Sequence, residues 1–363
     1  MPSHYAIQKA HNDIVRLCHT GLDSATLRRE TMRRLRHVLP VDSFWFATAD
    51  PATLLFTGSV VDSIPENATP LFIANEFLQN DVNKWTQLAR AKLPVNSLYL
   101  ATKGMPKRSP RYRDICLPLG FGDELRAALR TGNSSWGFMC LHRERNGSRF
   151  SQAEVAMLAA LAPHIAQGLR AALLLKRAEN TDGIKGPGLL LLARDLSLMA
   201  ATEAGRYWLS EISDTPTQQE LPQAIYAIVA RLIALEHGSY STGLAPRARI
   251  QCRSGQWLVM HASRLSGRGL PGETAIIFEP AQPAEVAPLL LEAYGLTQRE
   301  AQLAHLVLRG MDTAQISRML AISDLTVQQH LKSIFDKAGV SSRRELAAQI
   351  FYEHKRGNRR LAH

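Results

Sequence analysis

The chain has 363 residues, of which 45% are hydrophobic and 21% are charged. This length and apolar content allow two or three domains, each with its own core, and exclude a disordered chain. The formal net charge of +11, with a sequence pI near 9.7, fits a nucleic-acid partner, although a membrane surface would attract the same charge.

No apolar run approaches the roughly eighteen residues that a membrane-spanning helix requires, and the first residues lack the basic and apolar regions of a secretory signal. We therefore expect a soluble, cytoplasmic protein with no membrane partner. The cysteines form no CxxC pair and the histidines show no metal-ligand spacing, so we expect neither a metal nor another cofactor. Phosphate-binding, nucleophile-elbow, HExxH and dinucleotide motifs are absent, which argues against an enzyme.

The first 178 residues alternate helical and strand-like segments. Two amphipathic helices come first, and the arginines of the second are expected mostly on its solvated side. Two strand-like runs follow around Asp50-Pro51, then helical patches, and then a hairpin that turns at "TGN". Ser151 and Glu154 form a capping box for a closing helix, in which Pro163 predicts a kink or a break.

This order of elements resembles a GAF domain, and "SSWGFMCLHRERNGSRFSQAEVAMLAALAPHIAQGL" carries most of the resemblance. GAF domains bind small molecules or chromophores between sheet and helices, or serve only for dimerisation. By that resemblance, residues 1–178 form a sensory or dimerisation domain, and no ligand-binding residue can be assigned. Four strand aromatics are candidates for its pocket, although aromatics at such positions also form the core: Trp45, Phe46, Trp136 and Phe138.

A polar stretch with glycines at about 177–188 separates this region from a second mixed one. There, two short strands and a short helix precede the amphipathic helix "LPQAIYAIVARLIALE". Three strand-like runs follow, the first two joined at Ser254-Gly255. This order resembles a PAS domain over residues 188–280. The segment "AQPAEVAPLLLEAYG" then leads, through coil and a short helix, into the C-terminal region.

The C-terminal region predicts four short helices, because each of them has a readable start. Such starts place a Ser, Thr or Asp at the N-cap, in most cases with Glu or Gln three residues later. They are Thr297 with Glu300, Asp312 with Gln315, Ser323, and Ser342 with Glu345. Short helices joined by tight turns make a compact helix-turn-helix unit, which places one helix in a DNA groove.

The third of these helices has an apolar stripe and a polar side. Its apolar residues recur at spacings of four, three and four, which predicts that they face the core: Val327, Leu331, Ile334 and Ala338. Glutamines and a lysine on the other side suit base reading, because Gln pairs with adenine and Lys reaches guanine acceptors. An ordinary solvated helix face is the alternative, and the preceding helix and turn weigh against it.

Residues 295–352, including "TAQISRMLAISDLTVQQHLKSIFDKAGVSSRREL", resemble the DNA-binding domain of LuxR-type (FixJ- or GerE-type) bacterial transcription regulators. By that resemblance, the third helix enters the major groove and the fourth pairs two such domains on DNA. The positions that match base contacts are Gln328, Gln329 and Lys332. Backbone contacts match Thr326, His330, Lys337 and Arg343, and pairing matches Leu346, Ala347 and Ile350.

The chain departs from this family at two places. Gln328 stands where Lys is common, and Thr313-Ala314 replace a common Asn-Lys pair, so weaker non-specific DNA binding is expected. The tail can offset this weakening, although a solvated terminus is an equal alternative; its cations are Lys355, Arg356, Arg359 and Arg360. From 297 to 363 there are 11 Lys/Arg against 6 Asp/Glu, so positive charge gathers at the DNA-binding end.

These features predict an α+β multidomain chain in which GAF-like (1–178) and PAS-like (188–280) α/β sensory domains precede an all-α, four-helix LuxR-type helix-turn-helix domain (295–363). We expect a transcription regulator that binds double-stranded DNA at a pseudo-palindromic site as a homodimer. We expect it to respond to a small-molecule effector, whose identity the sequence does not give. The alternative is a DNA-binding regulator whose front domains only dimerise or bind a partner protein.

Overall fold

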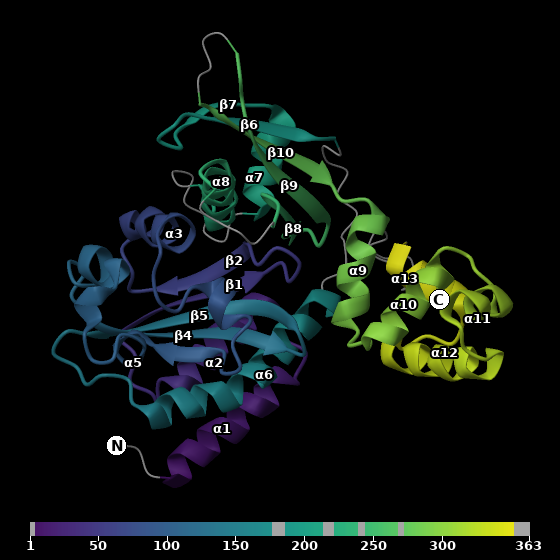
Figure 1. The fold of residues 1–363 in the computed structure, drawn as a ribbon, viewed down its shortest axis with the longest axis horizontal. Coiled ribbons are helices and arrows are strands. Elements are labelled where there is room, and N and C mark those ends of the chain that lie inside the picture. Colours follow the sequence, from purple (N-terminus) through teal and green to yellow (C-terminus); the bar gives the residue numbers. More distant parts are fainter. Residues whose placement is uncertain (1–3, 176–185, 213–220, 239–243, 268–271, 352–363) are drawn as a thin grey trace, which may run out of the picture.

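The computed structural model describes residues 4–175, 186–212, 221–238, 244–267 and 272–351. It has two antiparallel sheets of five strands, each with its own helices, followed by a group of helices at the C-terminal end (Figure 1). The helix that follows the second sheet lies between the two sheet domains and that C-terminal group.

The first sheet has the strand order β2-β1-β5-β4-β3. Its strands are β1 (Ser43–Ala49), β2 (Phe56–Asp62), β3 (Val95–Ser97), β4 (Phe121–Thr131) and β5 (Ser134–Glu144). The strands around Asp50-Pro51 and the hairpin that turns after Thr131 are therefore confirmed.

Helices cover both faces of this sheet. One face packs on α1 (His4–Cys18), α2 (Ser24–Leu35) and α6 (Gln152–Leu175). The other face packs on α3 (Thr69–Leu78), α4 (Trp85–Leu88), α5 (Leu98–Ala101) and the short turns η1 (Glu66–Ala68), η2 (Pro106–Arg108) and η3 (Tyr112–Cys116). Helices thus lie on both faces of the sheet (Figure 1), and buried apolar residues pack on each face.

Two local features of this domain depend on its tertiary structure. Pro163 does not break α6, which continues to Leu175; the proline is exposed, so its ring lies toward solvent where a missing N–H is tolerated best. Arg28 is the exception among arginines that are otherwise exposed or half-buried, as expected: it is only 4% exposed and its guanidinium donates to the Phe46 carbonyl at 2.9 Å. The Ser151–Glu154 capping box is confirmed.

Among the described residues, α6 is the one helix long and apolar enough, by length and composition alone, to cross a membrane. It packs against β4 and α1 in the core of the first domain, and core helices pass the same test.

The second sheet has the order β7-β6-β10-β9-β8. Its strands are β6 (Gly188–Leu192), β7 (Leu198–Ala201), β8 (Arg247–Gln251), β9 (Trp257–Arg264) and β10 (Thr274–Pro280). Two helices, α7 (Glu203–Ile212) and α8 (Gln223–Glu236), cover one of its faces, and α8 also packs against α3 and β2 of the first domain. Counted within each domain, both sheets follow the same strand order, 2-1-5-4-3.

The C-terminal end consists of helices joined by short turns. They are α9 (Pro283–Ala293), α10 (Gln298–Leu308), α11 (Thr313–Leu320), α12 (Asp324–Ala338) and α13 (Arg343–Phe351). The capping boxes of α10 and α11 and the Ser323 cap of α12 are confirmed. At α13 the pattern differs, because the Glu345 carboxylate accepts from the Ser341 N–H instead of the Ser342 N–H.

Candidate nucleic-acid interface and sensory pocket

The apolar stripe of α12 faces the core, as its spacing predicts. Its four residues are at most 5% exposed: Val327, Leu331, Ile334 and Ala338. The three predicted base-contact residues are all exposed: Gln328, Gln329 and Lys332. Thr326 and His330 are half-buried at the flanks. The surface of α12 that points away from the protein is thus the one that carries Gln and Lys side chains.

A buried carboxylate fixes α12 against α10. The Ser333 hydroxyl and the Lys337 ammonium each donate to Glu300, at 2.6 Å. Burial alone raises the pKa of Glu300, but the hydrogen bonds from Lys337, Ser333 and Thr297 lower it to about 2. Lys337 is exposed over 35% of its side chain and is held in this ion pair, so it positions α12 whether or not it also reaches a phosphate.

Thr313 joins three helices at the edge of this surface. Its hydroxyl oxygen accepts from Gln328 Nε2 at 3.1 Å and from Arg343 at 2.8 Å. A second guanidinium nitrogen of Arg343 donates to the Met311 carbonyl at 2.7 Å. The threonine at the start of α11 therefore connects that helix with α12 and α13, a role that the sequence pattern did not reveal.

The predicted pairing residues of α13 face inward in this chain. Leu346 and Ile350 are 0% and 2% exposed, whereas Ala347 is half-buried. Helix α13 packs on α9 and α10, and Gln349 Nε2 donates to the Tyr294 hydroxyl at 2.7 Å. The basic tail residues, Lys355 to Arg360, lie outside the described residues.

The sequence pattern did not identify one exposed side chain on α12 as a candidate for the DNA-facing surface. Leu325 is 70% exposed and lies one turn before Gln328 and Gln329. A search for polar, hydrogen-bonding residues passes over a leucine, although its helical position alone would have identified it.

A second candidate site is a cavity of about 50 Å³ in the first domain, on the face of the sheet that α3 and α4 cover. Its lining mixes aromatic and polar side chains, among them Trp45, Phe72, Trp85, Glu76, Arg126 and His142. Gln223 of α8 also lines it, and Trp45 Nε1 donates to Gln223 Oε1 across the domain boundary. The neighbouring domain thus contributes a lining residue to the cavity.

Only one of the four aromatic candidates lines this cavity. Trp45 does so, and its ring lies 5.8 Å from that of Trp85. Phe46 and Trp136 belong to the core on the opposite face of the sheet. Phe138 is fully buried and stacks on Trp85 at 4.9 Å, behind the cavity wall.

Alternation along the β4–β5 hairpin brings four polar or sulfur side chains to the cavity side of the sheet. The hairpin register places Glu124 opposite His142 and Arg126 opposite Cys140. These four residues are at most 4% exposed. The intervening residues Leu125 and Leu141 face the α6 core instead. Because side chains alternate between the two faces along each strand, the hairpin places a row of polar residues, the polar floor, on the cavity side of the sheet.

Charges in this floor are paired. Arg111 donates to Glu124 at 2.8 Å, and Arg126 donates to Glu76 at 2.8 Å and lies 3.1 Å from Glu124. Burial alone raises the pKa of Glu124, but Arg111 and Arg126 lower it well below its ordinary value. Glu124 therefore remains ionised.

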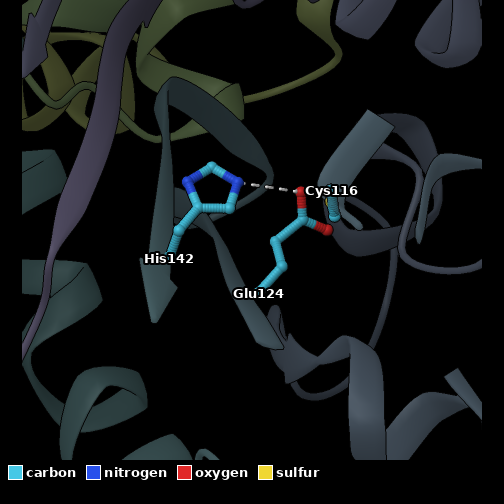
Figure 2. Close-up of side chains that lie close together, drawn as sticks. All are labelled: Cys116, Glu124 and His142. Atoms are coloured by element: carbon cyan, nitrogen blue, oxygen red, sulfur yellow. Dashed lines mark ion pairs between the residues drawn. The ribbon is translucent and has the colours of Figure 1, made fainter. Parts of the chain in front are cut away.

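Figure 2 shows that Cys116, Glu124 and His142 lie close together. Their donor atoms lie within 4.8 Å of one another. Because Glu124 is already bound by two arginines, and burial raises the pKa of the Cys116 thiol, this donor set fits a metal ion poorly. Glu124 instead faces His142 Nε2 at 3.5 Å, which favours the tautomer with the proton on that nitrogen.

The other nitrogen of His142 has no partner. Nδ1 is buried without a hydrogen bond, on the side of the ring away from Glu124 (Figure 2), and His142 lines the cavity. With the proton on Nε2, Nδ1 is an acceptor that a bound molecule could satisfy.

Residues 295–349 match the family described as bacterial regulatory proteins, luxR family. The C-terminal unit is a luxR-family domain. Residues 23–169 match the GAF domain family, so the first domain is a GAF domain. A protein of Aeromonas salmonicida, named as an HTH-type transcriptional regulator in the exeN 3' region, is 31% identical over 112 residues, which are 31% of this chain and 54% of that protein. The chain thus matches about half the length of this curated relative.

The whole chain also overlaps loosely with solved structures. Escherichia coli SdiA is 10% identical with a TM-score of 0.33, covering 94% of this chain and 95% of SdiA. The GAF domain of A. aeolicus nlh2 is 12% identical with a TM-score of 0.27, covering 46% of this chain and 96% of its own. Neither overlap is close enough to transfer a ligand or a partner to this chain.

Proposed function

We propose that the chain is a sequence-specific transcription regulator that binds double-stranded DNA through α12. The observation that carries this proposal is the pair of opposite stripes on α12: a buried apolar one, and an exposed one with Gln329 and Lys332, within a luxR-family domain. Gln328, Gln329 and Lys332 would read bases, because their side chains suit adenine and guanine edges. Thr326, His330, Lys337 and Arg343 would lie near the phosphates.

We infer that two chains bind an inverted repeat, because two symmetry-related reading helices need two half-sites. In this structure, Leu346 and Ile350 are engaged by the chain's own core. Pairing through those residues would require α13 to change its contact with α9, whereas pairing through Ala347 would not. The front of the chain would control that contact through α9, which touches both α6 and α13.

We further infer that the GAF cavity receives the signal. Its aromatic walls and the unpartnered Nδ1 of His142 suit a small, flat, mainly apolar molecule that carries one N–H or O–H group. Gln223 would transmit binding to the central domain, which we assign as PAS-like on its strand order; the proposed domains are 1–178, 188–280 and 295–363. The alternative is a front half that only dimerises or binds a partner protein.

A pull-down of fragmented host DNA with the purified full-length chain tests the main proposal. Enrichment of a few sites that share an inverted repeat is the expected result. Enrichment spread evenly over the genome, in the presence and absence of a small-molecule extract of the host, would contradict sequence-specific reading. Repeating the experiment with His142→Phe, whose ring can still stack on Phe121, distinguishes a front half that binds a small molecule in the cavity from one that does not. A response to the extract that this variant no longer shows supports binding in the cavity.

A further inference from the structure

Leu325 occupies an unusual position for an apolar side chain. It is the second residue of α12 and is 70% exposed, more than any other large hydrophobic residue of the described part except Tyr5. Single exposed leucines are common on protein surfaces and by themselves carry no information. The position of this one on the helix makes it informative.

Two stripes run along α12 with the same spacing. The buried stripe has steps of four, three and four residues: Val327, Leu331, Ile334 and Ala338. Starting two residues earlier, the same steps give an exposed stripe: Leu325, Gln329, Lys332 and Asp336. An offset of two residues is about 200° around a helix, so the second stripe points directly away from the core. Leu325 therefore begins the line of side chains that contains two of the proposed base readers.

In helix-turn-helix proteins, residues in the N-terminal part of the reading helix contact base edges in the major groove. Here the first turn of α12 is held by the Ser323 hydroxyl, which accepts from the Thr326 N–H at 3.1 Å. Leu325 projects from this fixed turn and has no hydrogen-bonding group. Among the four bases, only thymine presents an apolar group in the major groove, its C5-methyl.

Resting on the proposed function, we propose that Leu325 contacts the C5-methyl group of one thymine in each half-site and so adds an apolar specificity contact to the polar readers. The contact would contribute preference for thymine at that base pair and none at the pairs that Gln328, Gln329 and Lys332 read. It would also exclude water from the polar contacts beside it.

Replacing thymine by deoxyuridine tests the proposal, because it removes the methyl group and leaves every base-pairing and hydrogen-bonding group in place. Sites are first selected from random double-stranded DNA with the full chain. Each thymine of the selected site is then replaced in turn. The affinity of the wild-type chain should fall about fourfold at one thymine per half-site, the decrease expected for one methyl contact.

Leu325→Ala should bind the thymine and deoxyuridine sites equally at that position. Gln329→Ala is the matched control, since it should bind more weakly overall and still distinguish the two bases there. Leu325→Met, which keeps an apolar side chain of similar length, should keep part of the discrimination. Thermal unfolding of each variant checks its fold, and an exposed side chain should change the unfolding temperature little.

Two outcomes would overturn the proposal. Leu325→Ala could retain the full thymine-over-deoxyuridine preference, which would assign the methyl contact to another residue. Leu325→Ala could also bind all sites like the wild type but fail to regulate transcription, which would place a protein partner on Leu325. Failure of the selection to yield any shared site would instead contradict the proposed function, so the two failures are distinguishable.

Discussion

The two lysines of α12 have different surroundings, so replacing each of them should have a different effect on DNA binding. Lys332 extends from the exposed stripe, whereas Lys337 donates to Glu300 at 2.6 Å and helps to hold the helix in place. A charge count treats these lysines as equivalent DNA contacts. Their geometry separates a residue that reads DNA from one that positions the reader.

Lys332→Ala should weaken binding to the selected site by about 1–3 kcal/mol and relax the base preference at one position. Fluorescence anisotropy with the selected site and with single-base variants measures both effects. Lys107→Ala is the control, because it removes the same charge from an exposed position in the GAF domain. An unchanged base preference in Lys332→Ala would mean that the reading face is assigned wrongly.

Glu300→Gln should destabilise the luxR-family domain in a pH-dependent way. The pKa of Glu300 is lowered to about 2 in the folded chain, against an unfolded value near 4.5. Its contribution is therefore present above pH 4.5 and is lost as the pH falls from 4.5 toward 2. At pH 7 the free energy of unfolding of the variant should be about 2–3 kcal/mol lower than that of the wild type. This difference should shrink below pH 4.5.

Denaturant titrations of both chains between pH 7 and pH 3 measure this difference. Glu345→Gln serves as the control, because that carboxylate caps α13 at an exposed position and should have a smaller effect. If the difference in free energy of unfolding between the wild type and Glu300→Gln stays constant over this pH range, the carboxylate charge does not hold α12.

At the scale of helices and strands, the sequence predicts the features that depend on residues close together in the chain. The Thr297 and Asp312 capping boxes and the stripe on α12 depend on residues a few positions apart, and all of them are confirmed. Arg28 is an exception to the solvated arginines of α2, because its partner, the Phe46 carbonyl, comes from a strand that its own helix pattern does not contain. Helical periodicity identifies a stripe, but not which polar residue the rest of the fold covers.

Interactions between distant segments account for most of what the sequence could not give. The floor of the GAF cavity exists because the β4–β5 register pairs Glu124 with His142, while Arg111 arrives from outside the hairpin. Nothing in the spacing of these residues indicates a buried charge network. In the same way, the sequence pattern at Thr313 indicated only that a common phosphate-binding residue is missing, whereas the structure shows its bonds to Gln328 and Arg343.

Removing the segment after residue 352 should lower affinity for all DNA sequences. It carries four of the eleven Lys/Arg residues between 297 and 363, so fewer counterions would be released on binding. The slope of log affinity against log salt should flatten by about 0.9 for each phosphate that the shortened chain no longer neutralises, with base preference unchanged. Anisotropy titrations between low and moderate salt measure that slope, and an unaltered slope would leave the tail without a role in DNA binding.

At the scale of the whole molecule, a buried ion pair adds to the apolar packing that joins two sheets of the same strand order. Asp50 lies at the end of β1 and accepts three hydrogen bonds from Arg249 on β8, at 2.6, 2.9 and 3.0 Å. Its side chain is 1% exposed and that of Arg249 is 10% exposed. Gln223 of the second domain also lines the GAF cavity, so under the proposed function this ion pair would help to set the geometry through which a signal passes.

Asp50→Asn should loosen the two domains from each other. It leaves the Arg249 guanidinium buried without its countercharge, and breaking such a pair from one side costs about 3–5 kcal/mol. Unfolding followed by tryptophan fluorescence should show a lower midpoint, and limited proteolysis should cut faster between the domains. Glu285→Gln is the matched control, since its ion pair with Arg247 of the same strand is more than 30% exposed on both sides and should contribute less than about 1 kcal/mol.

A double variant makes this prediction specific to charge. Adding Arg249→Leu to Asp50→Asn removes the stranded cation, and should recover part of the stability because no unpaired charge is then left in the interface. The response of DNA binding to a small molecule should nevertheless stay impaired in the double variant, because the hydrogen bonds that align β1 with β8 are missing. Full recovery of stability together with a full response would show that packing of α8 on α3 is sufficient to couple the domains.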